Sequence, residues 1–199
     1  MNSIINADSN LTTRRELLGG VSTLTLSAAA IALLGGTSTA GLAATGNASA
    51  DVAILNVALG LEYEAIAAYQ LGAESGLLKK PELDVAVLFQ SHHKAHRDAL
   101  IATIGKLGGR ANSDKSKDDY LKSSKLNVAA LKSDIDVLRL AQRLEQGATN
   151  AYLGVIPSLT DQELAKVAAR LAADETLHYT ALTLTLGDRL PDSALTFGA

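Results

Sequence analysis

Two short segments of the 199-residue chain carry paired side chains that could bind a metal ion. Glu175 and His178 lie three residues apart, and His93 and His96 repeat that spacing earlier in the chain. Residues three apart share one face of a helix, so each pair can direct both side chains to one point. Imidazole and carboxylate groups bind several transition metals, so the pairs predict a metal site without identifying the metal.

Two further glutamates lie inside apolar stripes at helical spacing. Glu62 shares its stripe with Leu59 and Ile66, and Glu145 shares one with Leu138. A buried carboxylate is costly unless it is paired, protonated or bound to a cation. One carboxylate from each of two helices, with a Glu-x-x-His pair from each of the other two, is the ligand set of dimetal sites in helical bundles. The candidate ligands are therefore Glu62, His93, His96, Glu145, Glu175 and His178.

The neighbouring histidines and acids also have readings without a metal. Taken alone, His93 and His96 would more often be surface or capped histidines, and it is their coincidence with the glutamates that favours a metal. His92 is expected beside solvent, although its four-residue spacing from His96 keeps it as a substitute ligand. Glu64 and Asp174 are interpreted as surface or hydrogen-bonding groups.

Two tyrosines accompany the candidate ligands. Tyr69 and Tyr152 are expected to be packing residues rather than redox radicals, because a buried tyrosine usually needs only one partner for its hydroxyl. A hydrogen bond from each hydroxyl to a metal ligand is an intermediate expectation.

The candidate residues recur because the chain contains an internal repeat. Leu61-Glu62 followed by Ala68-Tyr69 reappears as Leu144-Glu145 followed by Ala151-Tyr152, and residues 93–100 align with residues 175–182. Two similar helical pairs therefore place their acids and imidazoles near mid-helix. In an antiparallel bundle these groups meet at one level.

Four long helices are needed to position these residues, and the sequence predicts them over residues 51–75, 81–108, 133–156 and 160–187. Gly76 and Gly187 are expected stops, and Thr160 with Glu163 is expected to form a capping box. Short connections within each half and a long, polar connection between the halves predict an all-α, antiparallel four-helix bundle with a long crossover. A short helix over 118–131 is expected in that crossover.

The overall composition agrees with this fold and excludes other classes. The chain has no cysteine, no tryptophan and a net charge of −3, with 18 basic and 21 acidic residues. The absence of cysteine excludes thiolate metal sites. The near-neutral charge argues against a nucleic-acid binder, which would normally have a basic face, so no nucleic-acid partner is expected.

Residues 1–50 are interpreted as a leader and linker, ahead of a bundle over 51–187 and a tail over 188–199. Arg14 and Arg15 precede a mildly apolar stretch over residues 17–34, which resembles a twin-arginine export signal. Cleavage is expected between residues 43 and 50, which predicts a periplasmic or otherwise extracytoplasmic protein that meets the membrane only through this signal. An uncleaved membrane anchor is the alternative.

Residues 51–187 resemble the ferritin-like superfamily, particularly exported ferritin-like proteins related to plant desiccation-associated proteins. His93 departs from that pattern, because the family normally has a bridging glutamate there. Three carboxylates leave two divalent cations with a net charge of about +1, so a mixed or single-metal site suits the set at least as well. Iron or manganese is expected first, with zinc or copper as alternatives. Five candidate ligands match the family's metal positions: Glu62, His96, Glu145, Glu175 and His178.

The resemblance implies an envelope metal-binding protein or oxidoreductase that acts on dioxygen, peroxide or ferrous iron. The alternative is a non-catalytic envelope or stress protein with a degenerate centre, which His93 favours. A partner-binding module is a third reading, for which the sequence offers no motif. The smaller exported relatives are a better match than a 24-subunit cage, and a homodimer is compatible with them. No catalytic residue and no organic cofactor are assigned.

Overall fold

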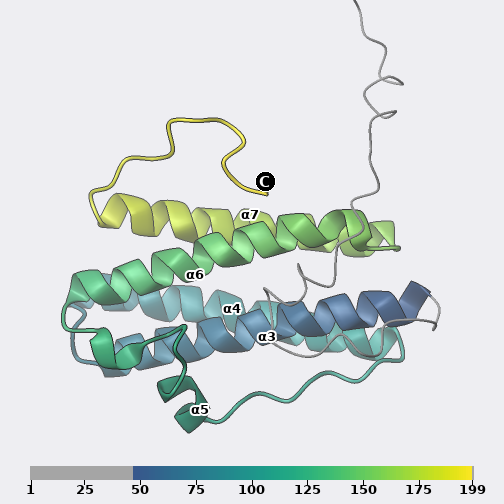
Figure 1. The fold of residues 1–199 in the computed structure, drawn as a ribbon, viewed down its shortest axis with the longest axis horizontal. Helices are drawn as coiled ribbons and strands as arrows, with labels where there is room; N and C mark the ends of the chain where they lie inside the picture. The colour runs from purple at the N-terminus through teal and green to yellow at the C-terminus, as the bar shows by residue number, and fades with distance from the viewer. Residues whose placement is uncertain (1–46, 199) are drawn as a thin grey trace, which may run out of the picture.

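The computed structural model describes residues 47–198, and these form an all-helical bundle without strands (Figure 1). The predicted fold class is confirmed, with a long crossover between the second and third long helices. Residues 1–46, which include most of the predicted leader and its export signal, lie outside the described residues. The elements in chain order are α3 (Asn47–Glu74), α4 (Lys80–Lys106), α5 (Lys117–Leu121), the 3₁₀ helix η1 (Val128–Ala130), α6 (Asp134–Val155), η2 (Ile156–Ser158) and α7 (Gln162–Thr185).

The four long helices pack as two antiparallel pairs. Helix α3 packs mainly on α4, and α6 packs mainly on α7, while α3 and α6 also contact each other. In Figure 1, α3 and α6 lie nearer the viewer, with α4 and α7 behind them. The crossover runs back along the bundle, so that α6 begins at the end where α3 finishes. This topology brings the middles of all four helices to one level.

Most predicted helix boundaries agree with the structure. Gly76 and Gly187 have φ angles of +71° and +73°, which glycine adopts without steric strain after a helix end. At the start of α6, the Ser133 side chain accepts from the Asp136 backbone N–H at 3.2 Å, and Asp136 accepts from the Ser133 N–H at 2.9 Å. This capping box fixes where α6 begins. Helix α3 begins four residues before the expected position of Asp51.

Two local predictions were wrong in detail. Asp161, rather than Thr160, caps α7 and accepts from the Glu163 N–H at 2.8 Å. Thr160 instead donates its backbone N–H and its hydroxyl to the Asp51 carboxylate, at 3.0 and 2.6 Å. A buried carboxylate that needs donors is the stronger partner for Thr160, so the cap moves one residue along the chain. The helix expected over 118–131 is divided into α5 and η1.

The bundle core is divided into two apolar clusters with a polar layer between them. Tyr152 belongs to the first cluster and Tyr69 to the second, and both rings are buried. The first cluster includes Leu55, Leu59, Leu100, Ile104, Leu164 and Leu171. The second includes Ala86, Phe89, Leu138, Ala141 and Leu182. A third cluster, containing Leu71, Tyr120, Leu126 and Leu140, lies where the crossover covers the bundle.

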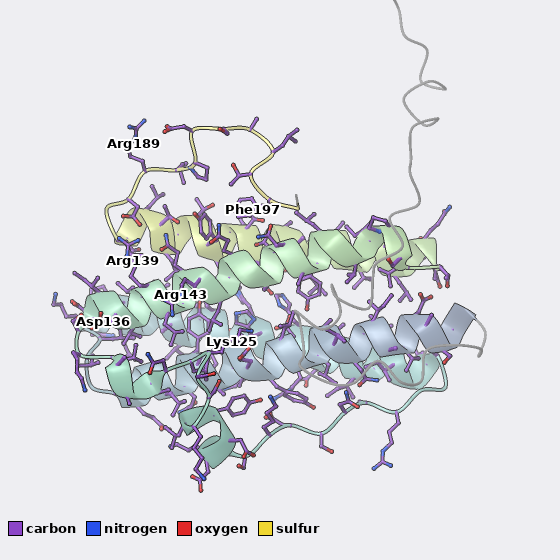
Figure 2. All side chains as sticks on the ribbon, in the orientation of Figure 1. Lys125, Asp136, Arg139, Arg143, Arg189 and Phe197 are labelled. Carbon is purple, nitrogen blue, oxygen red and sulfur yellow. The ribbon has the colours of Figure 1, made fainter. Side chains whose placement is uncertain are left out.

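The segment after α7 folds back over that helix. Asp188 pairs with Arg139 of α6, and the Phe197 ring meets the Tyr179 ring edge-on at a centroid distance of 5.2 Å. Figure 2 shows Phe197 above α7. The tail is therefore held at both of its ends.

Helix α3 is long and apolar enough, over Ala48–Glu74, to pass a length-and-composition test for a membrane span. Core helices pass the same test. Its buried residues include Asp51 and Glu62, which face protein partners from α4, α6 and the loop before α7.

Candidate metal centre

The structure brings all six predicted ligands together in the polar layer. Every one of the six side chains is at most 8 % exposed, although each carries an ionisable group. They come from all four long helices, as the internal repeat predicts. The contributors are Glu62 of α3, His93 and His96 of α4, Glu145 of α6, and Glu175 and His178 of α7.

The six side chains form two overlapping groups with the spacing of metal ligands. The donor atoms within each group all lie within 4.8 Å of one another. His93 and Glu175 belong to both groups, so they are the shared members at the middle of the cluster. Glu62 and His96 complete one group, and Glu145 and His178 complete the other.

The Glu175 carboxylate faces both halves of the cluster. Its Oε1 lies 3.2 Å from His96 Nδ1, and its Oε2 lies 3.1 Å from His178 Nδ1. Each oxygen therefore points to a different histidine. A carboxylate in this position can bridge two cations, or can anchor one cation between the two rings.

His93 spans the same cluster through its two ring nitrogens. Its Nδ1 lies 2.8 Å from Glu62 Oε2, and its Nε2 lies 3.1 Å from Glu145 Oε1. The ring thus connects the glutamates of α3 and α6. His93 occupies the position at which the resemblance to the ferritin-like superfamily implies a bridging glutamate.

Each buried tyrosine hydroxyl donates to the glutamate of the opposite half. Tyr152 donates to Glu62 Oε1, and Tyr69 donates to Glu145 Oε1. Burial and the charge of the neighbouring carboxylate raise the pKa of both tyrosines well above the ordinary value. Both hydroxyls therefore remain protonated donors, which agrees with the interpretation of the tyrosines as supports for metal ligands.

Two residues outside the predicted ligand set orient the histidine rings. His96 Nε2 lies 3.2 Å from Asp174 Oδ2, and His178 Nε2 lies 3.0 Å from His92 Nδ1. With the Nε2 atoms engaged on the outer side, the Nδ1 atoms of both rings face the cluster centre. Sequence reasoning gave Asp174 only a general hydrogen-bonding role and placed His92 beside solvent. The internal repeat could have indicated both roles, because Asp174 immediately precedes Glu175 and His92 immediately precedes His93, the two residues shared by both groups.

The electrostatics of the cluster favour the charged forms of its histidines and of Glu62 and Glu145, whereas burial raises the pKa of Glu175. Burial opposes protonation of His96, but the adjacent glutamates outweigh it and raise the pKa of His96 to about 10. Burial likewise opposes protonation of His93, and its hydrogen bonds to Glu145 and Glu62 raise the His93 pKa well above normal. Burial works against ionisation of Glu145, yet bonds to His178 and His93 lower the pKa of its carboxyl group. Metal binding would therefore displace protons from these imidazoles.

Three buried donor atoms at the centre fit a bound cation. Within the described residues, His96 Nδ1, Glu145 Oε2 and Glu175 Oε1 make no contact with hydrogen-bond geometry, although the first and the last lie 3.2 Å apart and buried polar atoms normally make such a bond. All three belong to the predicted ligands and come from three different helices. A nitrogen and oxygen donor set of this kind suits iron, manganese or zinc.

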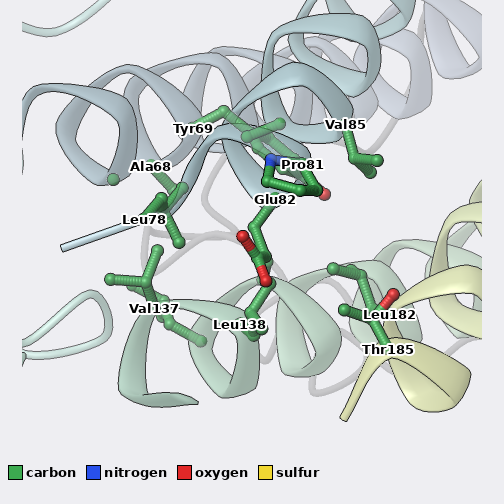
Figure 3. A pocket seen from close by; sticks show the side chains of 14 residues that line it. Ala68, Tyr69, Leu78, Pro81, Glu82, Val85, Val137, Leu138, Leu182 and Thr185 are labelled. Carbon is green, nitrogen blue, oxygen red and sulfur yellow. The ribbon is translucent and has the colours of Figure 1, made fainter. Parts of the chain in front are cut away.

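Two cavities border the polar layer. One, of about 200 Å³, lies between α3 and α6 and is lined in part by His93 and Glu145. The other, of about 130 Å³, is mainly apolar and is lined by Tyr69 but by none of the six ligands (Figure 3). Glu82 is the one acidic residue on the apolar wall. Only the first cavity reaches ligand residues directly.

Comparison with known proteins identifies the same bundle. A model of the ferritin-like domain family matches residues 50–188. Among solved structures, the chain is similar to the conserved hypothetical protein Rv2844 from Mycobacterium tuberculosis, at 22% sequence identity and a TM-score of 0.60. That alignment covers 75% of this chain and 99% of the other, and at this identity it shows the fold alone. No curated protein matches the chain significantly.

Proposed function

The chain belongs to the ferritin-like domain family, and from that premise we propose that it is a metal-binding protein whose bundle centre holds one or two divalent cations. The observation that carries the proposal is the position of Glu175, whose two oxygens face the Nδ1 atoms of two different histidines. Such a carboxylate belongs equally to both groups of donor atoms.

Each half of the cluster supplies ligands for one ion. Glu62 and His96 would hold one ion, Glu145 and His178 would hold the other, and Glu175 would be common to both. If the imidazoles are neutral, the centre with its three carboxylates has a net charge of about +1 with two divalent ions bound and about −1 with one ion bound. Iron or manganese is the first choice for this oxygen-rich set, and zinc or copper is the alternative.

The proposed activity is oxidoreduction of a small oxidant such as dioxygen or peroxide, with ferrous iron as the alternative substrate. A redox-active ion with an open position would supply that chemistry. The protein's own residues prepare the site for it. Tyr69 and Tyr152 hold the glutamates, Asp174 and His92 hold the histidine rings, and the two apolar clusters exclude water on either side.

A second candidate is a non-catalytic envelope or stress protein that retains the bundle with an altered centre. His93 favours this alternative, because its ring already joins Glu62 and Glu145 at 2.8 and 3.1 Å. A protonated imidazole in that position neutralises carboxylates that would otherwise require a cation.

We further propose export of the protein through the twin-arginine pathway to an extracytoplasmic compartment. Arg14 and Arg15 carry this proposal, together with the mildly apolar stretch that follows them. Replacement of both arginines by lysine should retain the precursor in the cytoplasm. Amino-terminal sequencing of the exported protein should find cleavage between residues 43 and 50.

Elemental analysis tests the metal proposal directly. Protein purified from cells should contain stoichiometric metal, and Glu145→Ala or His178→Ala should lose it while the bundle stays helical by circular dichroism. Glu163→Ala, an exposed residue in the first turn of α7, is the control and should keep the metal. If the purified protein contains no metal and its melting temperature does not change when iron, manganese or zinc is added, the non-catalytic alternative is supported.

A further inference from the structure

The cavity between α3 and α6 connects the protein surface with the polar layer. Its inner wall includes His93 and Glu145, which are each only 1 % exposed. Its outer wall includes three charged residues, Glu64, Lys125 and Arg143. At about 200 Å³, the cavity has room for several water-sized groups. A small solute could therefore travel from the surface to candidate metal ligands by this route.

Small residues keep the cavity open. Ala65 of α3 and Gly147 and Ala148 of α6 form part of its wall. A Cβ atom added at Gly147 would have no heavy atom within 4 Å, so the space beside this glycine is open. Larger side chains at these positions would occupy the route between the helices. The width of the cavity thus depends on a few residues that a variant can change.

The mouth of the cavity carries an excess of positive charge. Lys125 of the crossover pairs with Glu64 of α3, which neutralises one cation. Arg143 of α6 is exposed, and its guanidinium donates only to the Arg139 carbonyl, at 3.4 Å, with no carboxylate partner within residues 47–198. Figure 2 shows Lys125 and Arg143 near the junction of α3 and α6. The three groups together carry a net charge of about +1, with Arg143 left free to meet an incoming anion.

We propose that this cavity admits and binds a small monovalent anion of two or three heavy atoms, such as azide, superoxide or hydroperoxide. The inference rests on the proposed metal-binding function and names the substrate class for that site. The positive mouth attracts an anion from solvent, and the cavity leads it to the ligands His93 and Glu145. Two divalent ions in this three-carboxylate centre leave a net positive charge, which favours the same class of ligand.

The first test needs no metal. Crystals of the metal-free protein soaked in sodium bromide should show an anomalous peak at the cavity mouth beside Arg143. The peak should disappear in Arg143→Gln and persist in Arg189→Gln, which changes an exposed arginine of the tail. Bromide found only elsewhere on the surface, or unchanged in Arg143→Gln, would indicate an adventitious ion only and would overturn the proposal.

The second test uses the metal-loaded protein and azide, followed by the absorption band of the metal–azide complex. Arg143→Gln should weaken azide binding by roughly threefold, because it removes an exposed positive charge. Glu64→Gln should strengthen azide binding by a similar factor, because it removes a negative charge and releases Lys125 from its ion pair. Both effects should shrink as the salt concentration rises. Equal azide affinity in the two variants would overturn the proposal.

A larger side chain in the cavity wall tests the access route independently of charge. Gly147→Leu should slow azide binding by at least about tenfold without reducing metal content. Gly154→Leu is the matched control, because Gly154 lies on the same helix, also has open space around an added Cβ and does not line the cavity. Wild-type protein that binds no metal would contradict the proposed function. A Gly147→Leu variant that binds metal normally and binds azide at the wild-type rate would contradict this inference alone.

Discussion

His93 and Glu175 face each other across the middle of the candidate centre, with His93 Nδ1 3.7 Å from Glu175 Oε1. They occupy equivalent places in the two halves of the internal repeat, and both belong to both groups of donor atoms. One shared position is thus an imidazole and the other is a carboxylate. This asymmetry is the feature that most distinguishes the centre from a symmetric four-carboxylate site.

His93→Glu should increase the dependence of the fold on metal. Four buried carboxylates repel one another without a cation, so the metal-free variant should be less stable than the metal-free wild type. With manganese, a second bridging carboxylate should tighten binding about tenfold, which adds about 3–5 °C to the metal-induced rise in melting temperature. Differential scanning calorimetry with and without manganese measures both effects. Ala95→Glu, at an exposed position of the same helix, should show neither effect.

Tyr69→Phe and Tyr152→Phe should each destabilise the protein by about 1–3 kcal/mol. Tyr152→Phe leaves Glu62 Oε1 without its hydroxyl donor, and an unsatisfied buried acceptor has a cost of this size. Tyr69→Phe should fall at the lower end of the range, because Glu145 Oε1 keeps its contact with His93 Nε2. Urea unfolding of the metal-free protein gives the free energies. Tyr63→Phe is the comparison, because among the described residues its hydroxyl makes one exposed bond, of 3.3 Å, to the Asn112 carbonyl. Loss of this bond should cost less than about 0.5 kcal/mol. Equal losses in all three variants would refute a special role for the buried pair.

Asp174→Asn should weaken metal binding while leaving the fold intact. The Asp174 carboxylate holds His96 by its Nε2 and leaves Nδ1 directed to the centre, and outer partners of this kind typically contribute 10–100-fold to affinity. Competition with a chelator measures the change. Asp98→Asn changes an exposed acid of α4 whose ion pair within residues 47–198 is with Arg97, so its chelator curve should overlay that of the wild type.

Asp51→Ala should destabilise the bundle by about 1–3 kcal/mol without altering the metal stoichiometry. The buried Asp51 carboxylate accepts two hydrogen bonds from Thr160 and thereby ties the start of α3 to the loop before α7. Asp161→Ala removes the neighbouring helix cap and should cost about 1 kcal/mol. A smaller loss for Asp51→Ala than for Asp161→Ala would show that this tie contributes little to stability.

The repeat made the fold and the cluster predictable. Matching positions in two helical pairs must lie at one level when the pairs pack antiparallel, and this is where Glu62, His96, Glu145 and His178 are found. The helix ends at Gly76 and Gly187 were also predictable, because both glycines adopt positive φ angles that other residues avoid.

The partners across the bundle could not be predicted from spacing. Tyr69 lies seven residues after Glu62, which is about 10 Å along a helix and beyond the reach of its hydroxyl, so it bonds Glu145 of the other half instead. The outer contacts of Asp174 and His92 depend on ring orientation, which helical periodicity does not specify. The capping error at Thr160 has the same origin, since its competing partner Asp51 is 109 residues away.

The position of bound ions is the most direct test of the central claim. Crystals of the protein loaded with manganese should give anomalous peaks within bonding distance of the Glu175 carboxylate, one beside His96 Nδ1 and, for a two-ion centre, a second beside His178 Nδ1. A single peak shared by the two rings would indicate a one-ion centre. Loaded crystals with no peak among these side chains, and with His93 still joining Glu62 and Glu145, would contradict the metal-binding account.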